Sequence, residues 1–426
     1  MSTGSAMRTV SPWIWVPTLY FAQGLPNGLL EDVAPVMFKD LGVDNARITE
    51  ALALAATPWV LKAFWGPLVD AYGRKRIWIW AGQLLCAAAF AGFAFTPMFS
   101  DPLVTGAFLL AVVAFASATH DVAADGFYLF GVPTEHERSF FSGVRNTAFR
   151  LAKVFASGVI VVIAGALIQS GTSVSASWSV ALGVLAATML GLSAWHAWSL
   201  PRPVEDKPTG DGRESVFRAF INGWKTFFAK PGVMSLLAFI LFFRLAEALL
   251  TIMAPLFLKG ARERGGLGLS TETFGLLNTG GVVALLLGGV LGGVIVSRVG
   301  LKRMLWPMVA IMHLPNLAFL ALAHWQPENV PVIATALFLE KFGYGFGFCA
   351  FMLYLLYVCT GERRVTHYAF CSGFMMLGAK LPGIWAGRIQ DALGYEMFFV
   401  IVMIAVIPGV IVTKLVDKIP GEFGRR

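Results

Sequence analysis

Apolar stretches long enough to cross a lipid bilayer recur along almost the whole of this chain. Of its 426 residues, 57% are hydrophobic and only 14% are charged, and a soluble fold cannot bury so much apolar surface. A stretch of about 20 apolar residues crosses hydrocarbon as a helix, because the helix satisfies its own backbone hydrogen bonds. The sequence therefore predicts an all-α, multi-pass membrane protein.

We predict twelve transmembrane helices, at about 12–37, 47–71, 77–97, 103–130, 140–168, 178–199, 232–258, 272–297, 303–324, 331–359, 366–390 and 395–416. Lys and Arg gather in the connections on one side, which include the triplet Arg74–Arg76. That side is cytoplasmic by the positive-inside rule, so both termini are expected inside. Lys259, Arg262 and Arg264 are the exception, in an outer loop.

Several classes of function are excluded by what the sequence contains. The net charge of +8 lies in loops beside apolar spans, so it indicates membrane orientation and no nucleic-acid partner. The cysteines all fall inside apolar stretches, which predicts neither a disulfide framework nor a metal site: Cys86, Cys349, Cys359 and Cys371. We find no nucleotide-binding or catalytic pattern, so we expect no enzyme activity and no cofactor.

A turn rich in glycine and basic residues occurs twice. The first copy, LKAFWGPLVDAYGRKR at 61–76, carries Asp70 before its basic triplet, and the second is GGVIVSRVGLKR at 292–303. Equivalent positions in the two copies are 227 residues apart, and Lys153 and Lys380 are separated by the same offset. A turn repeated at a fixed offset in a membrane chain is typical of a duplicated transporter.

The duplication predicts two six-helix bundles related by pseudo-two-fold symmetry. We expect an N-terminal bundle at 1–199, a cytoplasmic linker at 200–231 and a C-terminal bundle at 232–426. Near the start of each half, Lys39 and Lys259 match at an offset of 220. Parallel repeats of this kind place the substrate site near the bilayer midplane between the bundles, which rock against each other during transport.

The linker contains apolar residues at helical spacing: Phe217, Phe220, Ile221, Trp224, Phe227 and Phe228. Polar residues occupy the opposite face, so the segment is predicted to be an amphipathic helix on the inner membrane surface. A target helix for a calmodulin-like partner is the alternative.

Charged residues inside the predicted spans are candidate functional residues, because a charge there needs a partner or a water-filled cavity. Asp125 and Arg145 lie at similar depth on adjacent antiparallel helices, and Asp121 and Arg150 are matched one turn deeper. This spacing predicts two ion pairs. They either tie the helices together or act as a gate that breaks when the inner side opens.

Nearer the midplane, the predicted spans carry Lys153, Arg244, Lys341 and Lys380 against Glu247 and Glu340. Arg244 and Glu247 are three residues apart on one predicted helix and can neutralise each other. The surplus of positive charge predicts a cavity for an anionic substrate, with the four basic side chains as substrate contacts.

Polar and aromatic side chains of spans one and ten complete the predicted substrate contacts: Gln23, Asn27, Tyr344 and Tyr354. Core packing is the alternative for the two tyrosines. Glu247, Glu340 and Asp121 are the candidate acids for a coupling proton, because a buried carboxyl beside a cation can be poised between its two protonation states.

Asp70 and Arg74 of the first turn are candidate gating residues. Asp70 lies near the inner end of span two, where it can meet basic residues or a helix end of the other half. Ser297 stands in its place in the second copy, so the two turns are not equivalent.

The turn also carries a family resemblance. The major facilitator superfamily has Gly-x-x-x-Asp-(Arg/x)-x-Gly-Arg-(Lys/Arg) between spans two and three, matched here by Gly66, Asp70, Gly73, Arg74 and Lys75. Ala71 stands where the superfamily usually has Arg. Within the superfamily the chain is most similar to AmpG-type permeases, through segments at 20–29, 117–129 and 367–395.

This resemblance implies a proton-driven importer in the bacterial inner (cytoplasmic) membrane, which takes up the anhydro-muropeptides released in cell-wall recycling. Twelve-helix relatives in the same group include ferric-siderophore permeases, so siderophore uptake is the alternative. Both substrates are bulky amphiphilic anions, in agreement with the predicted cationic cavity. The expected partners are a small-molecule substrate, protons and the lipid bilayer, and the protein is expected to be a monomer.

Overall fold

The computed structural model describes residues 10–132, 135–203, 206, 213–358 and 364–416. These residues form helices and connections, and no strand occurs among them. Nine helical segments of the described chain are long and apolar enough to span a membrane, and the last of them, Phe370–Leu415, covers two of the predicted spans. The first two predicted spans are helical as well. The all-α prediction is confirmed, and the helices are consistent with twelve spans.

The first half contains α1 (Pro12–Gly28), η1 (Leu29–Val33), α2 (Ala34–Asp40), α3 (Asn45–Ala55), α4 (Thr57–Ala71), α5 (Lys75–Phe93), η2 (Thr96–Met98), α6 (Pro102–Gly131), α7 (Glu135–Val154), η3 (Phe155–Ile160), α8 (Val161–Gln169) and α9 (Val174–Ser199). The second half follows α10 (Arg213–Phe228) and contains α11 (Val233–Phe242), α12 (Leu245–Lys259), η4 (Arg262–Arg264), α13 (Thr271–Val299), α14 (Leu301–His313), η5 (Leu314–Asn316), α15 (Leu317–Trp325), α16 (Val330–Val358), α17 (Arg364–Lys380), α18 (Gly383–Ile404) and α19 (Val406–Val416).

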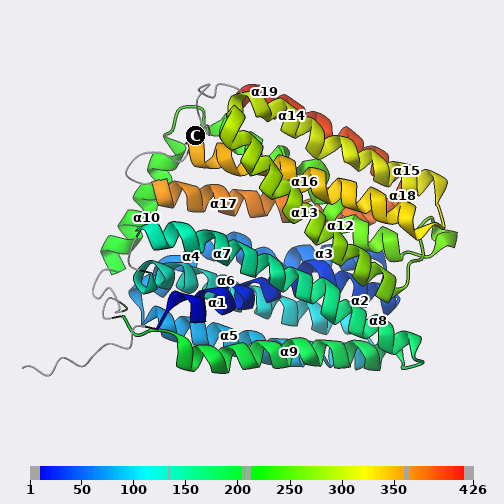
Figure 1. Ribbon diagram of the computed structural model, residues 1–426, viewed down its shortest axis with the longest axis horizontal. Helices are drawn as coiled ribbons and strands as arrows, with labels where there is room; N and C mark the ends of the chain where they lie inside the picture. The colour runs from blue at the N-terminus through cyan, green and yellow to red at the C-terminus, as the bar shows by residue number, and fades with distance from the viewer. Residues whose placement is uncertain (1–9, 133–134, 204–205, 207–212, 359–363, 417–426) are drawn as a thin grey trace, which may run out of the picture.

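The helices of the two halves form two layers that run in the same general direction. Figure 1 shows α1 to α9 in the lower layer, α11 to α19 in the upper layer, and α10 along one end of both. The layers contact each other through α3 with α18, α2 with α12, α8 with α13, and α4 with α17. The first and second halves of the chain therefore meet along a long interface.

The linker helix α10 packs its aromatic face against protein. Trp224 stacks on Phe64 of α4 with ring centroids 6.3 Å apart, and lies 4.3 Å from Phe370 of α17. Phe227 is fully buried, whereas Phe228 remains 45% exposed. The linker is helical over Arg213–Phe228, but Trp224 and Phe227 cover helix ends of both halves, because α4 and α17 offer aromatic partners there. Its place on the inner membrane surface stays a prediction.

Several predicted spans are interrupted near their middle. The first passes through the π-helical segment η1, and the fifth passes through η3, which begins two residues after Lys153. The seventh breaks at Arg244, whose backbone angles are φ −107° and ψ 15°. Interruptions of this kind redirect side chains and frequently mark functional sites.

Two glycines let α1 approach α7 closely. A Cβ atom on Gly24 would lie 2.5 Å from the Phe149 carbonyl oxygen, and one on Gly28 would lie 2.6 Å from the Ala156 Cβ. Small residues four positions apart are a common device for close packing of membrane helices. This contact brings η1 against η3, beside Lys153 near the end of α7.

We predict that Gly24→Ala lowers the melting temperature of the detergent-purified protein. The added methyl group collides with backbone that cannot move aside, and such overpacking costs about 1–3 kcal/mol. The matched control is Gly183→Ala in α9, where a Cβ meets nothing within 4 Å, so its helix propensity alone should raise stability slightly. Equal melting temperatures for the two variants would contradict the close contact.

Candidate functional site

A cluster of charged side chains lies where the interrupted helices of the two halves meet. Its centre is Glu31 in η1, whose Oε2 accepts a hydrogen bond from Lys153 Nζ at 2.6 Å. The other carboxylate oxygen, Oε1, accepts from Lys380 Nζ at 2.5 Å. Lys153 is in the first half and Lys380 ends α17 in the second, so one carboxylate joins the two halves.

Asp32 and Asn278 extend this cluster. Asp32 Oδ2 lies 3.6 Å from Lys153 Nζ, and Asn278 Nδ2 of α13 donates to Asp32 Oδ1 at 3.2 Å. We call Glu31, Asp32, Lys153, Asn278 and Lys380 the central cluster. Its charged side chains keep between 14% and 23% of their surface exposed. The cluster is therefore partly open to solvent between the halves.

The predicted surplus of positive charge at the midplane is wrong. Glu31 and Asp32 also lie there, so that the four cations Lys153, Arg244, Lys341 and Lys380 are matched in number by four carboxylates. The same rule that selected the other charges would have found both acids, since they interrupt the first apolar span. The cations are balanced, so only their position and exposure support an anionic substrate.

The predicted pairing of Arg244 with Glu247 is also wrong. Arg244 precedes α12 in a non-helical conformation, so it does not share the face of Glu247. Its guanidinium donates to the Tyr344 hydroxyl and lies 4.6 Å from the centre of the Phe348 ring. The partners of Arg244 are therefore the aromatic residues Tyr344 and Phe348 and not Glu247.

Glu247 instead forms a buried pair with His313. His313 Nδ1 lies 2.5 Å from Glu247 Oε1, with the two side chains 4% and 1% exposed. Asn316 Nδ2 donates to the same oxygen at 3.1 Å. The partners come from the end of α14 and from η5, so a further helix interruption supplies them.

The remaining candidate residues at the midplane differ in how exposed their side chains are. Glu340 is 1% exposed and pairs with its neighbour Lys341 at 3.2 Å. Tyr354 is 6% exposed and packs edge-on against Phe239, which favours the core-packing alternative. Asn27 Nδ2 donates to Glu31 Oε1 at 3.4 Å, so this predicted contact borders the central cluster.

Gln23 adds an unsatisfied polar atom to the interior of the first span. Its Oε1 is buried and has no hydrogen-bond partner among the described residues. A buried acceptor without a partner is uncommon, so this oxygen remains available to a hydrogen-bond donor.

One of the two predicted ion pairs between spans four and five is confirmed. Arg145 lies 2.6 Å from Asp125 Oδ1, and Tyr20 donates to the same oxygen at 3.1 Å. The other pair is wrong, because Asp121 pairs with Lys62 of α4 at 3.5 Å. Helix α4 packs against α6. Matching the depths of residues on consecutive helices cannot predict a partner on such a neighbouring helix.

Arg150 instead reaches toward the second half. Its guanidinium lies 3.9 Å from the position that a Cβ on Gly289 of α13 would take. Arg150 therefore faces the interface between the halves. Its gating role stays a prediction.

The first turn is joined to the linker by a residue that sequence reasoning missed. The carboxylate of Asp206 accepts from the backbone N–H groups of Lys75 at 2.7 Å and Arg76 at 3.2 Å, at the start of α5. A carboxylate at a helix N-terminus is favourable. Arg74 is exposed beside it, whereas the side chain of Asp70 lies outside the described part of the structure. Their gating role remains a prediction.

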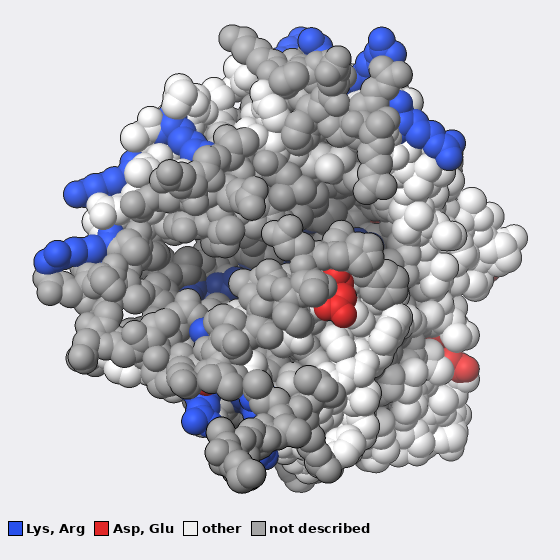
Figure 2. Space-filling model, turned by 60° about the vertical axis from the view of Figure 1, so that its left-hand side comes forward, with Lys and Arg blue, Asp and Glu red and all other residues white. Residues whose placement is uncertain are grey.

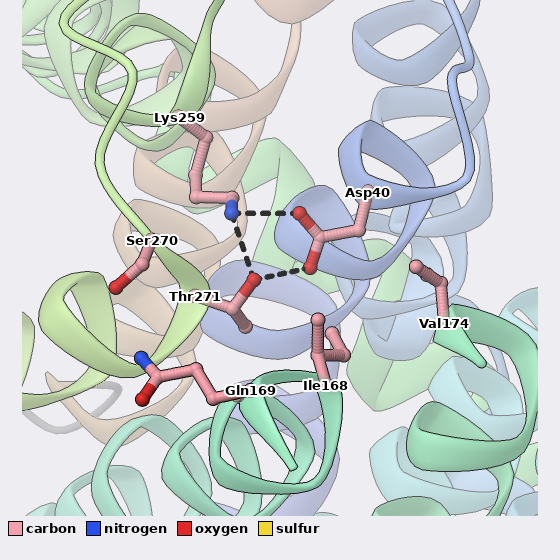
Figure 3. Close-up of a pocket in the computed structure, with 8 residues that line it drawn as sticks. Asp40, Ile168, Gln169, Val174, Lys259, Ser270 and Thr271 are labelled. Carbon is pink, nitrogen blue, oxygen red and sulfur yellow. Dashed lines mark hydrogen bonds and ion pairs between the residues drawn. The ribbon is translucent and has the colours of Figure 1, made fainter. Parts of the chain in front are cut away.

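The halves are closely joined at the end that the charge pattern predicts to be outer. Lys259 Nζ pairs with Asp40 Oδ1 at 2.7 Å, and both side chains are less than 10% exposed. Thr271 donates to Asp40 Oδ2 at 2.6 Å, beside a cavity of about 180 Å³ that Gln169 and Val174 help to line (Figure 3). Lys259 was an exception to the charge rule, and Asp40 explains it.

A second set of contacts joins α3 to α18 at the same end. Asn45 Nδ2 donates to Gln390 Oε1 at 2.5 Å, and Arg388 lies 2.6 Å from Glu50. The Gly387 backbone N–H donates to Thr49 at 3.1 Å. All of these bonds cross between the halves, so this end is closed.

The opposite end is hollowed. Figure 2 looks toward the end that carries α10 and shows Lys and Arg at the outer edge of this face and inside a hollow near its middle. The charge pattern predicts this end to be cytoplasmic. Closure at one end and a hollow at the other are the arrangement expected of an inward-facing transporter.

Comparison with known proteins identifies the family. The family model of the Major Facilitator Superfamily matches residues 18–379. The chain belongs to the Major Facilitator Superfamily. A multi-pass membrane transporter is the protein class that this membership establishes, and the predicted fold is confirmed.

Relatives within the superfamily carry AmpG names. The chain is 25% identical over 407 residues to the putative transporter AmpG 4 of Rickettsia conorii, covering 92% of this chain and 94% of that protein. It is 25% identical over 400 residues to the anhydromuropeptide permease of Escherichia coli (strain K12), covering 92% and 77%. The resemblance to AmpG-type permeases is confirmed, and both relatives carry the names of transport proteins.

Solved structures of the superfamily share the fold. The nucleoside transporter NupG matches with a TM-score of 0.69 at 14% identity, covering 94% of this chain and 97% of that chain. A bacterial homologue of the human lysosomal transporter Spinster, in an inward-facing and unoccupied conformation, matches with a TM-score of 0.68 at 14% identity, covering 97% and 98%.

We predict that Lys259→Gln opens this superfamily member at the end that carries Asp40. The substitution removes the cation that pairs with the buried Asp40 carboxylate and leaves only its hydrogen bonds from Thr271 and Trp178. Loss of a buried pair costs roughly 3–5 kcal/mol, which shifts the equilibrium toward the open form by on the order of a hundredfold or more. A cysteine at Thr49, which is 1% exposed, reports opening through its labelling rate with a membrane-impermeant maleimide in nanodiscs.

The matched control for this experiment is Arg47→Gln. Arg47 pairs with Asp101 at 3.0 Å at the same end, but both residues belong to the first half and both are about half exposed. Its loss should leave the labelling rate of the Thr49 position unchanged. Equal rates in the Lys259 variant, the control and the parent would contradict a closing role for the buried pair.

Proposed function

We propose that this protein is a proton-coupled secondary importer of anhydro-muropeptides, or of similar bulky sugar–peptide anions, across the bacterial inner membrane. Both termini are cytoplasmic in this proposal, and the protein works by alternating access. The observation that carries it is the central cluster, in which Lys153 and Lys380 converge from the two halves on a partly exposed site at mid-depth.

The position of the two lysines supports an anionic substrate. They are equivalent residues of the duplicated halves, separated by the same offset as the repeated turns. A pair of ammonium groups facing each other across the interface can bind one acidic group from both sides at once. The similarity to the anhydromuropeptide permease of Escherichia coli supports a muropeptide as the substrate.

Alternating access is supported by the opposite states of the two ends. The contacts Asp40–Lys259 and Glu50–Arg388 would have to break for the outer end to open. Neither pair lies within a single half, so a rocking motion of one half against the other breaks both together.

Proton coupling is supported by acids that are buried beside a cation or an imidazole. Glu247 faces His313, Glu340 faces Lys341, and Asp121 faces Lys62. A proton that enters such a pair changes its net charge, and in a low-dielectric interior that change alters helix contacts strongly. These three acids are the proposed proton sites.

We predict that proteoliposomes containing the protein accumulate labelled anhydro-muropeptide, and accumulate it more with an inward acid gradient. Lys153→Ala and Lys380→Ala should each reduce uptake to the level of empty vesicles, because each removes one side of the anion site. Lys414→Ala, at an exposed position of α19, is the matched control and should transport normally.

A ferric siderophore is tested in parallel in the same vesicles. Uptake of the siderophore alone would replace the muropeptide with the alternative substrate. Normal muropeptide uptake by both lysine variants would contradict the anion site.

We predict that one of the variants Glu247→Gln, Glu340→Gln and Asp121→Asn loses proton-driven accumulation of muropeptide but keeps the exchange of internal for external muropeptide. The neutral side chain cannot take up or release the coupling proton, so uphill uptake driven by the acid gradient should fall by about 10²-fold or more, as loss of a proton-transfer group does elsewhere. Exchange of internal for external muropeptide, which needs no net proton movement, should persist. If all three variants accumulate substrate normally, none of these acids couples the proton.

A further inference from the structure

The carboxylate of Glu31 occupies the place that an acidic substrate would take. Its two oxygens are divided between the two lysines, with Oε1 on Lys380 and Oε2 on Lys153. A carboxylate held by one ammonium group at each oxygen has the geometry of a bound acid anion. The anion site between the halves is therefore filled by a side chain of the protein itself.

The duplication shows that this acid is an addition to an otherwise symmetric site. Lys153 and Lys380 are equivalent in the two halves, but Glu31 has no equivalent acid. At the offset of 220 that relates the first helices of the halves, its counterpart is Thr251. Two lysines from two halves thus share one acid from one half.

The surroundings of Glu31 allow its carboxylate to leave. It belongs to a five-residue π-helical segment, and its further hydrogen bond, from Asn27, is long at 3.4 Å. Its side chain is 22% exposed. If it moves away, Lys153 keeps a counter-charge, because Asp32 Oδ2 lies 3.6 Å from it, buried and without a hydrogen-bond partner among the described residues.

We propose that Lys153 and Lys380 form a binding site for a carboxylate of the substrate, and that Glu31 is the resident competitor that fills this site when no substrate is bound. The inference rests on the proposed function and narrows it, since the substrate must carry a free carboxylate small enough to fit between the two ammonium groups. Competition by Glu31 keeps the lysines paired in the empty carrier. It multiplies the apparent affinity for substrate by the fraction of time that the site is free.

The occupancy of the site is tested without any substrate. Purified protein is treated with an amine-acylating reagent at fixed pH, and acylation of each lysine is measured by mass spectrometry. Glu31→Ala and Glu31→Gln should both accelerate acylation of Lys380 by about tenfold, as expected if the acid occupies the site nine-tenths of the time. Exposed Lys414 is the internal standard, and Glu396→Gln, which removes an exposed acid paired with His324, is the matched control variant.

Small probes then test which chemistry the vacant site accepts. In the Glu31→Ala variant, acetate should slow acylation of Lys380 back toward the wild-type rate, whereas the neutral isostere acetamide should have no effect. If Glu31→Ala does not fold, the same comparison is made in Glu31→Gln. Unchanged acylation in both variants, or equal effects of acetate and acetamide, would overturn the proposal.

The substrate class is tested with two forms of one muropeptide. A GlcNAc-anhydroMurNAc tripeptide with free carboxylates should bind Glu31→Gln about tenfold more tightly than wild type, and Lys380→Gln should cancel that gain in the double variant. The same compound with its carboxylates converted to carboxamides should show no gain. A carboxamide form that gains equally would overturn the carboxylate assignment.

The two proposals fail in different ways. If acetate protects Lys380 but neither muropeptide form binds any variant, the anion site stands and the muropeptide assignment fails. If muropeptide is transported but Glu31→Gln binds it more weakly than wild type, the transport function stands and the competitor role of Glu31 fails.

Discussion

The centre of this structure depends on one carboxylate that holds two ammonium groups between the halves. A charge that enters a membrane interior must be paired or hydrated, because hydrocarbon offers neither water nor counter-ions. Glu31 meets this requirement for Lys153 and Lys380 together. The helix interruptions at η1 and η3 and the close contact of α1 with α7 place Glu31 against Lys153, and Lys380 reaches them from the end of α17. Helix packing, helix interruptions and ion pairing therefore all determine the position of the Glu31 carboxylate at the interface.

The sequence was sufficient for the fold and for part of the site. Helical spans follow from apolar length, and the duplication follows from a constant offset, so both are local properties of the chain. The pair Asp125–Arg145 was predictable from depth because its partners lie on consecutive antiparallel helices. The pairing of Asp121 with Lys62 was not, because α4 and α6 are not consecutive and their contact is a property of the bundle.

Helix breaks account for the other errors. Periodicity placed Arg244 and Glu247 on one face, but the chain leaves the helical conformation at Arg244 and gives each residue a different partner. The two acids of η1 were predictable from charge alone, because they interrupt an otherwise apolar span. Lys259 departs from the positive-inside rule. The structure gives the reason, because its side chain pairs with the buried carboxylate of Asp40.

The asymmetry of the central cluster has a mechanical consequence. The Glu31–Lys153 bond lies within the first half, whereas the Glu31–Lys380 bond crosses the interface. Any motion that separates the halves at this depth preserves the first bond and breaks the second, which leaves Lys380 without its counter-charge. An unpaired cation in a partly buried site is costly, so the empty carrier resists that motion. A solute carboxylate that binds Lys380 removes this resistance, because it supplies the counter-charge that Glu31 can no longer reach. In the proposed mechanism, substrate binding and the rocking of the halves are therefore linked through a single ion pair.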